Sequence, residues 1–465
     1  MPLSLPRPLL AAFGAALVAG CAASSTSTDA PARVTPAGAR TCDAYAFGAI
    51  GDGQAKDTAA LQRAIEACSQ DEGGTVVLAH GTFLSGTIVL HSHVTLRIER
   101  GATLLGSRDD ADYPTLKPLV VNTQLDDCRH ALIYAVGATA VRIEGGGTID
   151  GNADIDKWRG MTRREGERPM AIFTALSTDV AIEGVRVRNA ATWAVVNMEV
   201  EHLVIRGIDV DSPHGPTHDG ICLKSGGAKG LSDVVVRRNH VRGAGVANGL
   251  KLGTATVGPM RRIVFEDIAI ENAQAAAMAV ESVDGGEVSD VTFRRITLSD
   301  VGTPLFVLLG ARGPAGVGAI HDIHFETICG ERLRYPWGAL LTGAPADSAG
   351  RHDLQAITFK DVAITWHGVG DATGPHVFGS GVADVDRFPR YAGGYPDAKF
   401  VFATPTAKSE VIDYALPGYA FFVRDARGVT FDDCRVAVDG ADRRAAIVGR
   451  DADMAGECRR EAAPR

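Results

Sequence analysis

The stretch WAVVNM at residues 193–198 is the first of five short apolar segments that return at a nearly constant interval. The others are GICLKS at 220–225, GLKLGT at 249–254, AMAVES at 277–282 and PLFVLL at 304–309, so successive starts differ by 27, 29, 28 and 27 residues. A second set keeps step with the first: LVI at 203–205, VVV at 234–236, IVF at 263–265, VTF at 291–293 and IHF at 323–325. Two or more strands per repeat, with no helical pattern between them, predict an all-β chain folded as a parallel β-helix.

The same pattern extends toward the N-terminus, with GTVVL at 74–78, VTLRI at 94–98 and AVRI at 140–143. A leucine-rich solenoid is the competing repeat, but it needs shorter coils with regularly spaced Leu and Asn, and the sequence has no such pattern. A solenoid grows by adding coils to one core, so 465 residues do not require several domains. We expect one β-helix domain over residues 42–450 and a C-terminal tail over 451–465.

The open ends of such a solenoid must be covered, because exposed strand edges pair with other chains. Residues 57–68 predict a capping helix, with Asp57 as its N-cap and Leu61, Ile65 and Cys68 on one face. At the far end, irregular sequence surrounds residues 391–397 before strands return near residues 420–423 and 428–431.

Charge and cysteine content narrow the possible classes. The net charge of −9 gives no basic footprint, so we expect no nucleic-acid partner. The cysteines show no metal-ligand spacing, and we expect neither zinc nor another cofactor. Cys42–Cys68 and Cys434–Cys458 are plausible disulfides in an oxidising compartment. Cys222 lies in an alternating strand and is expected to be a packed small side chain rather than a nucleophile.

The first residues predict export. Arg7 precedes an apolar run at residues 9–18 that is too short to span a bilayer and is typical of a signal peptide. Small residues directly before Cys21 resemble the bacterial lipoprotein signal, which would leave Cys21 lipidated; an ordinary secretory signal cut nearby is the alternative. We expect a signal peptide over 1–20, a flexible tether over 21–41, and a monomer in the periplasm or anchored to the outer membrane of a bacterium, touching the membrane only through its lipid.

Several short motifs occur in an order that resembles the polygalacturonase-like family of glycoside hydrolases. They are GAIGDG at 48–53, GTFLSG at 81–86, GGTIDG at 146–151, RP at 168–169, ATW at 191–193, DGICLKS at 219–225 and NGLK at 248–251. The resemblance covers roughly residues 42–450, and the motifs at 191–193, 219–225 and 248–251 look similar to those of bacterial members. It implies a right-handed parallel β-helix that hydrolyses galacturonic-acid-containing, pectic chains by an inverting mechanism.

The catalytic pattern departs from that family. The resemblance implies an Asn-Thr-Asp coil, a coil of paired aspartates ending in Ile-Lys-Ser, and then Gly-His-Gly and Arg-Ile-Lys coils. Here residues 217–225 combine the first two, so that Asp219 matches the second of the paired aspartates and His218 stands where the family's proton donor would be. Asn248 occupies the place of the family histidine, and Glu281 lies near the expected Arg-Ile-Lys coil.

Inverting hydrolysis needs two carboxyl groups about 6.5–9.5 Å apart, one protonated and one ionised beside a water. Asp219 is the first candidate, with Asp211 in the loop upstream as a possible partner. Alternatively His218 or His214 donates the proton, because imidazole titrates near working pH.

Lys224 and Lys251 are expected to bind the sugar carboxylate, with Asn248, His214 and Glu281 as further substrate contacts. If Ile221 and Leu223 point inward, alternation turns Cys222 and Lys224 outward. Stacking the repeats then places side chains in two outward rows: Cys222, Lys251 and Ala279 in one, and Lys224, Gly253 and Glu281 in the other. Each candidate also has a simpler interpretation, as a turn aspartate, a loop histidine, a solvated lysine or a structural carboxylate.

Two other functions use the same scaffold. A polysaccharide lyase would use Lys224 or Lys251 as its base, with Ca²⁺ to acidify the C5 proton. A non-catalytic, surface-anchored glycan-binding solenoid would explain the missing aspartates. The products discriminate, since a lyase makes unsaturated sugars that absorb ultraviolet light, a hydrolase makes reducing ends without that absorbance, and a binding protein makes neither.

The lipoprotein hypothesis predicts that Cys21→Ser releases the protein from the membrane fraction, because the thiol that carries the lipid is lost. Fractionation of cells expressing the wild type and the variant, followed by immunoblotting, measures this. Unchanged membrane attachment of the variant would contradict the hypothesis.

Overall fold

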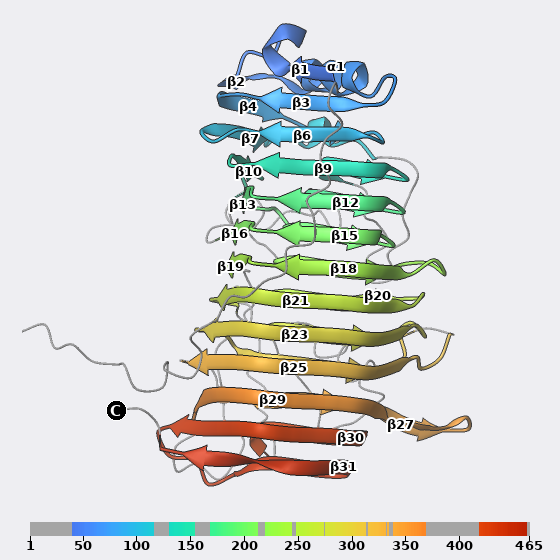
Figure 1. Ribbon diagram of the computed structural model, residues 1–465, viewed down its shortest axis with the longest axis vertical. Coiled ribbons are helices and arrows are strands. Elements are labelled where there is room, and N and C mark those ends of the chain that lie inside the picture. The colour runs from blue at the N-terminus through green and yellow to red at the C-terminus, as the bar shows by residue number, and fades with distance from the viewer. Residues whose placement is uncertain are drawn as a thin grey trace, which may run out of the picture.

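The computed structural model describes residues 40–115, 130–153, 168–212, 219–243, 248–273, 275–312, 315–331, 333, 338–368 and 418–462. Cys21, His214, His218 and the 391–397 loop lie outside these ranges. Figure 1 shows the described chain as a stack of parallel rungs that begins at α1 (Thr58–Cys68) and ends at β31 (Ala445–Glu461). The parallel β-helix predicted from the repeat is confirmed.

Three columns of parallel strands run along the stack. Column one contains β1 (Arg40–Asp43), β3 (Gly74–Leu78), β6 (Val94–Ile98), β9 (Thr139–Gly145), β12 (Thr178–Glu183), β15 (Glu201–Arg206) and β18 (Leu231–Arg237). Column two contains β2 (Asp52–Lys56), β4 (Gly81–Ser85), β7 (Ala102–Gly106), β10 (Thr148–Asp150), β13 (Arg186–Arg188), β16 (Asp209–Asp211) and β19 (His240–Arg242). Column three contains β5 (Ile88–Val89), β8 (Ala131–Val136), β11 (Met170–Ala175), β14 (Val195–Met198), β17 (Ile221–Ser225), β20 (Leu250–Thr256), β22 (Ala276–Ser282), β24 (Thr303–Leu309) and β26 (Ala339–Thr342).

Later coils fuse these columns into longer strands. Four strands bend through columns one and two: β21 (Met260–Glu271), β23 (Glu287–Ser299), β25 (Ala319–Glu331) and β29 (Leu354–His367). Two strands pass through all three columns: β30 (Gly418–Asp439) and β31. The remaining described elements are short: the 3-10 helices η2 (Ala44–Phe47) and η3 (Asp110–Asp112), and the antiparallel hairpin of β27 (Ala344–Asp347) and β28 (Gly350–His352).

The register passes unchanged from coil to coil in the core. Ile221 pairs with Leu250, which pairs with Met278, and all three side chains are buried in the central core. The predicted interior register of column three is therefore confirmed. In column one, the rings of Phe265, Phe293, Phe325 and Phe359 stack in consecutive coils with centroids 4.7, 5.1 and 5.0 Å apart.

Both ends of the stack differ in detail from the sequence prediction. Helix α1 buries Leu61, Ile65 and Cys68 as expected, and the Cys42–Cys68 disulfide ties it to β1. Asp57 stands at the N-cap position, but the expected capping bond is absent: its carboxylate accepts from the backbone N–H groups of Ile50 and Gly51 at 2.6 and 3.0 Å. No helix within the described ranges is long and apolar enough to cross a membrane.

The expected tail over residues 451–465 is wrong for most of its length. Strand β31 continues to Glu461 and pairs in parallel with β30 through all three columns. The second expected disulfide, Cys434–Cys458, joins these two last coils. The backbone of β30 therefore has a pairing partner beyond residue 450.

The stacked phenylalanines predict a large cost for Phe293→Ala. The side chain is fully buried between two other rings, so its removal should lower the free energy of unfolding by about 3–5 kcal/mol. Denaturant unfolding followed by circular dichroism measures it, with Thr292→Ala on the same strand as the matched control. Equal midpoints for the two variants would show that the ring stack contributes little.

Candidate functional site

Column three is buried on its outward face as well as its inward one. Cys222 and Lys224 alternate with the core residues Ile221 and Leu223, yet both are fully buried. Two apolar clusters lie along this outward face, one around Phe173, Trp193 and Val196 and the other around Phe306, Leu340 and Phe422. Between them lie four charged side chains, which we call the charged band: Asp219, Lys224, Lys251 and Glu281.

Asp219 accepts hydrogen bonds from four donors. Its Oδ2 accepts from the indole Nε1 of Trp193 at 2.8 Å and from the Cys222 thiol at 3.2 Å. Its Oδ1 accepts from the backbone N–H and the side-chain Nδ2 of Asn248, at 3.1 and 2.9 Å. An ionised carboxylate only accepts hydrogen bonds, so four converging donors match that form and fix its orientation.

Lys251 and Glu281 form a buried ion pair. Lys251 Nζ lies 2.8 Å from Glu281 Oε1, and the two side chains are 9% and 4% exposed. Burial by itself lowers the pKa of Lys251, but the carboxylates of Glu281 and Asp219 outweigh it and raise the pKa above its usual range. Lys251 is therefore an ammonium paired with Glu281 and influenced by the charge of Asp219.

Lys224 is the remaining member of the band, and Cys222 contacts the band through Asp219. Lys224 Nζ donates to the carbonyl of Gly253 at 2.9 Å and lies 5.0 Å from the centre of the Trp193 ring. Burial, together with the neighbouring Asp219, raises the pKa of the Cys222 thiol well above its ordinary value. The thiol is thus a protonated donor to Asp219, in agreement with its predicted role as a packed side chain.

The structure brings most of the described candidates together. Cys222 pairs with Lys251 and Lys251 with Ala279, which is the outward row expected from the repeat. The second expected row, Lys224, Gly253 and Glu281, is only partly right. The register shifts after Leu223, so that Ser225 pairs with Thr256. The interpretation of Lys224 and Lys251 as solvated surface lysines is wrong, since both are buried.

Asp211 lies at the end of β16 in column two, whereas the band lies along column three. Its carboxylate accepts from Arg242 Nη2 at 3.0 Å and lies 3.7 Å from Arg188 Nη2, and these arginines belong to the coils on either side. No described contact joins Asp211 to Asp219, and its catalytic role stays a prediction. The roles of His214 and His218 also stay predictions, because both residues lie outside the described ranges.

Two contacts of the band were missed by reasoning from sequence. Trp193 was expected as a strand residue and as part of the family-like motif at 191–193, but not as a hydrogen-bond donor to Asp219, although a buried indole N–H usually finds an acceptor. The direct Lys251–Glu281 contact was also missed, although their strands are adjacent in the repeat. The sequence feature that could have predicted this ion pair is the presence of two outward side chains of opposite charge, Lys251 and Glu281, in neighbouring coils.

Comparison with known proteins gives matches over different parts of the chain. A family described as "Rhamnogalacturonase A/epimerase, pectate lyase-like" matches residues 43–116. A "Probable polygalacturonase" of Vitis vinifera is 27% identical over 335 residues, which cover 68% of this chain and 67% of that protein. An "Exo-poly-alpha-D-galacturonosidase" of Dickeya chrysanthemi is 29% identical over 209 residues, which cover 42% of this chain and 32% of that protein.

Solved structures match over nearly the whole chain. The polygalacturonase of Erwinia carotovora has a TM-score of 0.59 at 16% identity, covering 92% of this chain and 100% of that one. The chain is polygalacturonase-like. The family 28 exopolygalacturonase of Yersinia enterocolitica has a TM-score of 0.57 at 17% identity, covering 91% and 78%. This polygalacturonase-like chain thus has the right-handed parallel β-helix fold that its motifs implied.

The buried pair predicts that Glu281→Leu destabilises the fold by about 3–5 kcal/mol, because it leaves the Lys251 ammonium buried without its closest counter-ion. The double variant Lys251→Met/Glu281→Leu should recover most of that loss, since neither charge is then buried. Denaturant unfolding at neutral pH measures both. The raised pKa of Lys251 means that the pair contributes below the lysine's ordinary pKa, and that this contribution disappears only in strongly alkaline solution. Equal stability of the single and double variants would contradict the prediction.

Proposed function

We propose that this chain is a glycoside hydrolase that cleaves galacturonic-acid-containing polysaccharide or oligosaccharide by an inverting acid/base mechanism. The observation that carries the proposal is the charged band of a polygalacturonase-like chain, in which the buried ammonium of Lys251 contacts the carboxylate of Glu281 and is influenced by the buried carboxylate of Asp219. A buried ammonium can bind the carboxylate of a uronate through charge-assisted hydrogen bonds.

An inverting reaction needs two carboxyl groups on either side of the bond that is cleaved. Asp219 lies two residues before β17 and Glu281 lies in β22, two coils further along the stack. Both carboxylates act on the buried ammonium of Lys251, Glu281 by direct contact and Asp219 by its charge. Asp219, oriented by its four donors, is proposed as the base that activates a water.

Substrate binding supplies the missing acid in this proposal. When a uronate carboxylate takes the ammonium of Lys251, Glu281 loses its counter-ion in a buried site. A buried carboxylate without a counter-ion favours the protonated form, so Glu281 becomes able to protonate the leaving oxygen. His218, next to Asp219 in the chain, is the other candidate for this role.

A second candidate function is glycan binding without catalysis. The observation that favours it is the saturation of Asp219, whose carboxylate already accepts from Trp193, Cys222 and Asn248 and is only 3% exposed. For the lyase alternative, the raised pKa of Lys251 keeps this lysine protonated and counts against it as the base, which leaves Lys224 as the candidate base.

Export belongs to the same proposal. An acidic plant polysaccharide lies outside the bacterial cell, and a lipid on Cys21 would keep a monomeric enzyme at the surface where such chains are met. The support for this part is the sequence of residues 1–21 alone.

We expect the purified chain to release reducing ends from a panel of defined pectic oligosaccharides without new ultraviolet absorbance. Asp219→Asn should lower the rate by at least ~10²-fold, the low end of the effect of removing a positioned base, while leaving the circular dichroism unchanged. Asp233→Asn is the matched control, because Asp233 is a carboxylate paired with Arg262 at a corner of column one, away from the band.

Each outcome assigns one function. Ultraviolet-absorbing products would replace the hydrolase proposal with a lyase. Oligosaccharide binding without any product would support the glycan-binding alternative. Full activity of Asp219→Asn would remove Asp219 from the mechanism.

A further inference from the structure

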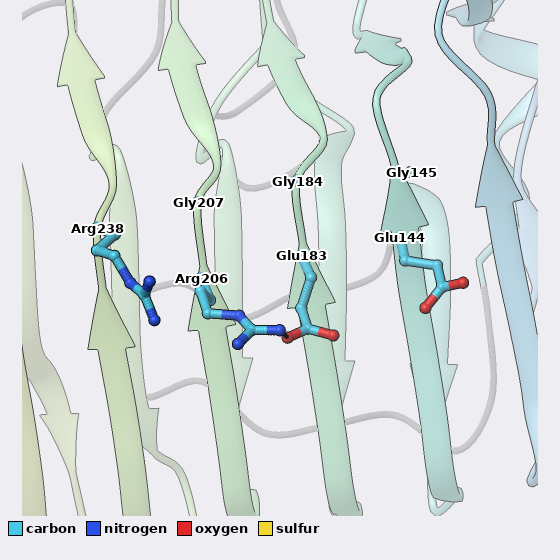
Figure 2. Close-up of a pocket in the computed structure, with 7 residues that line it drawn as sticks. All are labelled: Glu144, Gly145, Glu183, Gly184, Arg206, Gly207 and Arg238. Atoms are coloured by element: carbon cyan, nitrogen blue, oxygen red, sulfur yellow. Dashed lines mark ion pairs between the residues drawn. The ribbon is translucent and has the colours of Figure 1, made fainter. Parts of the chain in front are cut away.

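Column one keeps its register at the corner that Figure 2 shows. Glu144, Glu183 and Arg206 occupy the same position in three consecutive coils, and Arg206 contacts Glu183 at 2.6 Å. With Arg238 they line an open groove of about 440 Å³, in which two arginines balance two glutamates. An unbroken register thus lets charged side chains of neighbouring coils pair directly.

Column three breaks its register beside the charged band. The register shifts after Leu223, and Ser225 then pairs with Thr256. Lys224 of β17 therefore lies opposite three residues of β20, 253–255, which form a bulge. A bulge bends its strand and turns the groups on it in new directions, and this one lies next to a member of the charged band.

Gly253 allows the bulge to contact two members of the band. Its φ of 93° belongs to the left-handed region that favours glycine, and a Cβ at this position would lie 2.2 Å from the backbone oxygen of Glu281. Its own carbonyl accepts from Lys224 Nζ at 2.9 Å. The bulge therefore contacts Lys224 in the coil before it and Glu281 in the coil after it, and it supplies the acceptor that holds the lysine.

A buried ion pair from the following coils holds the bulge. Asp284 Oδ2 accepts from the backbone N–H of Thr256 at 3.1 Å, and Arg312 Nε donates to Asp284 Oδ1 at 2.8 Å. The Thr256 hydroxyl donates to the carbonyl of Thr254 at 3.1 Å and accepts from the backbone N–H of Val283 at 2.9 Å. The side chains of Arg312 and Asp284 are 11% and 7% exposed, so water competes little for these bonds.

We propose that Asp284 is a positioning residue, which holds the β20 bulge and thereby keeps the Gly253 carbonyl against Lys224. Lys224 is fully buried, so its ammonium needs an acceptor at a fixed place, and the bulge supplies one. Asp284 acts on the charged band only through Lys224 in this proposal. The effect expected on uronate binding rests on the proposed function, whereas the link from Asp284 to Lys224 does not.

The fluorescence of Trp193 tests this link without any substrate. The Lys224 ammonium lies 5.0 Å from the centre of the Trp193 ring, so a displaced ammonium changes the electric field at the indole and shifts its emission. Asp284→Asn should shift the Trp193 emission, and the same change in a Lys224→Met background should not. Because the chain has four tryptophans, each spectrum is compared with that of its Trp193→Phe counterpart.

A second change to the bulge keeps the test decisive if Asp284→Asn fails to fold. Thr256→Val removes the hydroxyl that bonds the Thr254 carbonyl without removing a charge, and it should also shift the Trp193 emission. Thr256→Ser keeps the hydroxyl and should restore the wild-type emission. Asp442→Asn is the matched control, because Asp442 is another buried carboxylate paired with an arginine, Arg444 at 2.7 Å, in the turn between β30 and β31.

Calorimetric titration with galacturonate, which has no glycosidic bond to cleave, tests the consequence for the charged band. Asp284→Asn should weaken binding at least about threefold in the wild-type background, as expected for two groups of one hydrogen-bonded network. It should have no further effect in the Lys224→Met background. A merely structural role would give the same loss in both backgrounds.

The positioning role is overturned if Asp284→Asn and Thr256→Val, both folded by circular dichroism, keep the Trp193 emission of the wild type. Equal emission shifts with and without Lys224 would also overturn it, because Asp284 would then act by another route. An emission shift in Asp442→Asn would do the same, since the effect would not be local. Absence of galacturonate binding to the wild type, with the expected emission results, would instead count against the proposed function alone.

Discussion

Lateral hydrogen bonding between successive coils is the constraint on which the rest of this structure depends. Every strand of columns one to three pairs in parallel with the strand one coil later, so the direction of each side chain is inherited from the coil before. A slip of one residue would exchange the inward and outward rows of a strand. The row of Ile221, Leu250 and Met278 therefore fixes the opposite row of Cys222, Lys251 and Ala279.

The same constraint decides how buried charge is neutralised. An outward side chain of column three has its nearest neighbours in the adjacent coils, and the partners of the charged band come from there. Lys251 meets Glu281 of the next coil, and Lys224 meets the carbonyl of Gly253. Asp219 is bonded from the preceding coil by Trp193 and from the following coil by Asn248. Each charge of the band is therefore compensated by groups of the adjacent coils rather than by its own strand.

How much of this structure could be predicted from the sequence depends on the feature. Features encoded by a repeated local pattern could be predicted, and features set by one tertiary contact could not. Period and alternation are repeated many times, so the β-helix, the capping helix and the interior register could be derived from them. A register shift occurs only once in these strands, so no repeated pattern indicates it. The segments GICLKS and GLKLGT do not predict that Ser225 pairs with Thr256 rather than with Thr254. Asp57 has the residue type of an N-cap, but the approach of Ile50 and Gly51 is a tertiary contact that local sequence does not contain. The tail boundary failed for a similar reason, because β31 is largely exposed and shows its strand character by pairing with β30 rather than by a buried face of its own.

In the proposed function, the charged band would bind an acidic sugar by an exchange of charges. Lys251 is already neutralised by Glu281, so binding of a uronate would exchange one carboxylate for another in a buried site. A neutral sugar cannot make this exchange, because it would leave both charges unpaired where desolvation is costly. In this proposal, selectivity for uronates at the band follows from charge balance in a buried site, because only an anionic sugar can replace Glu281 as the counter-ion of Lys251.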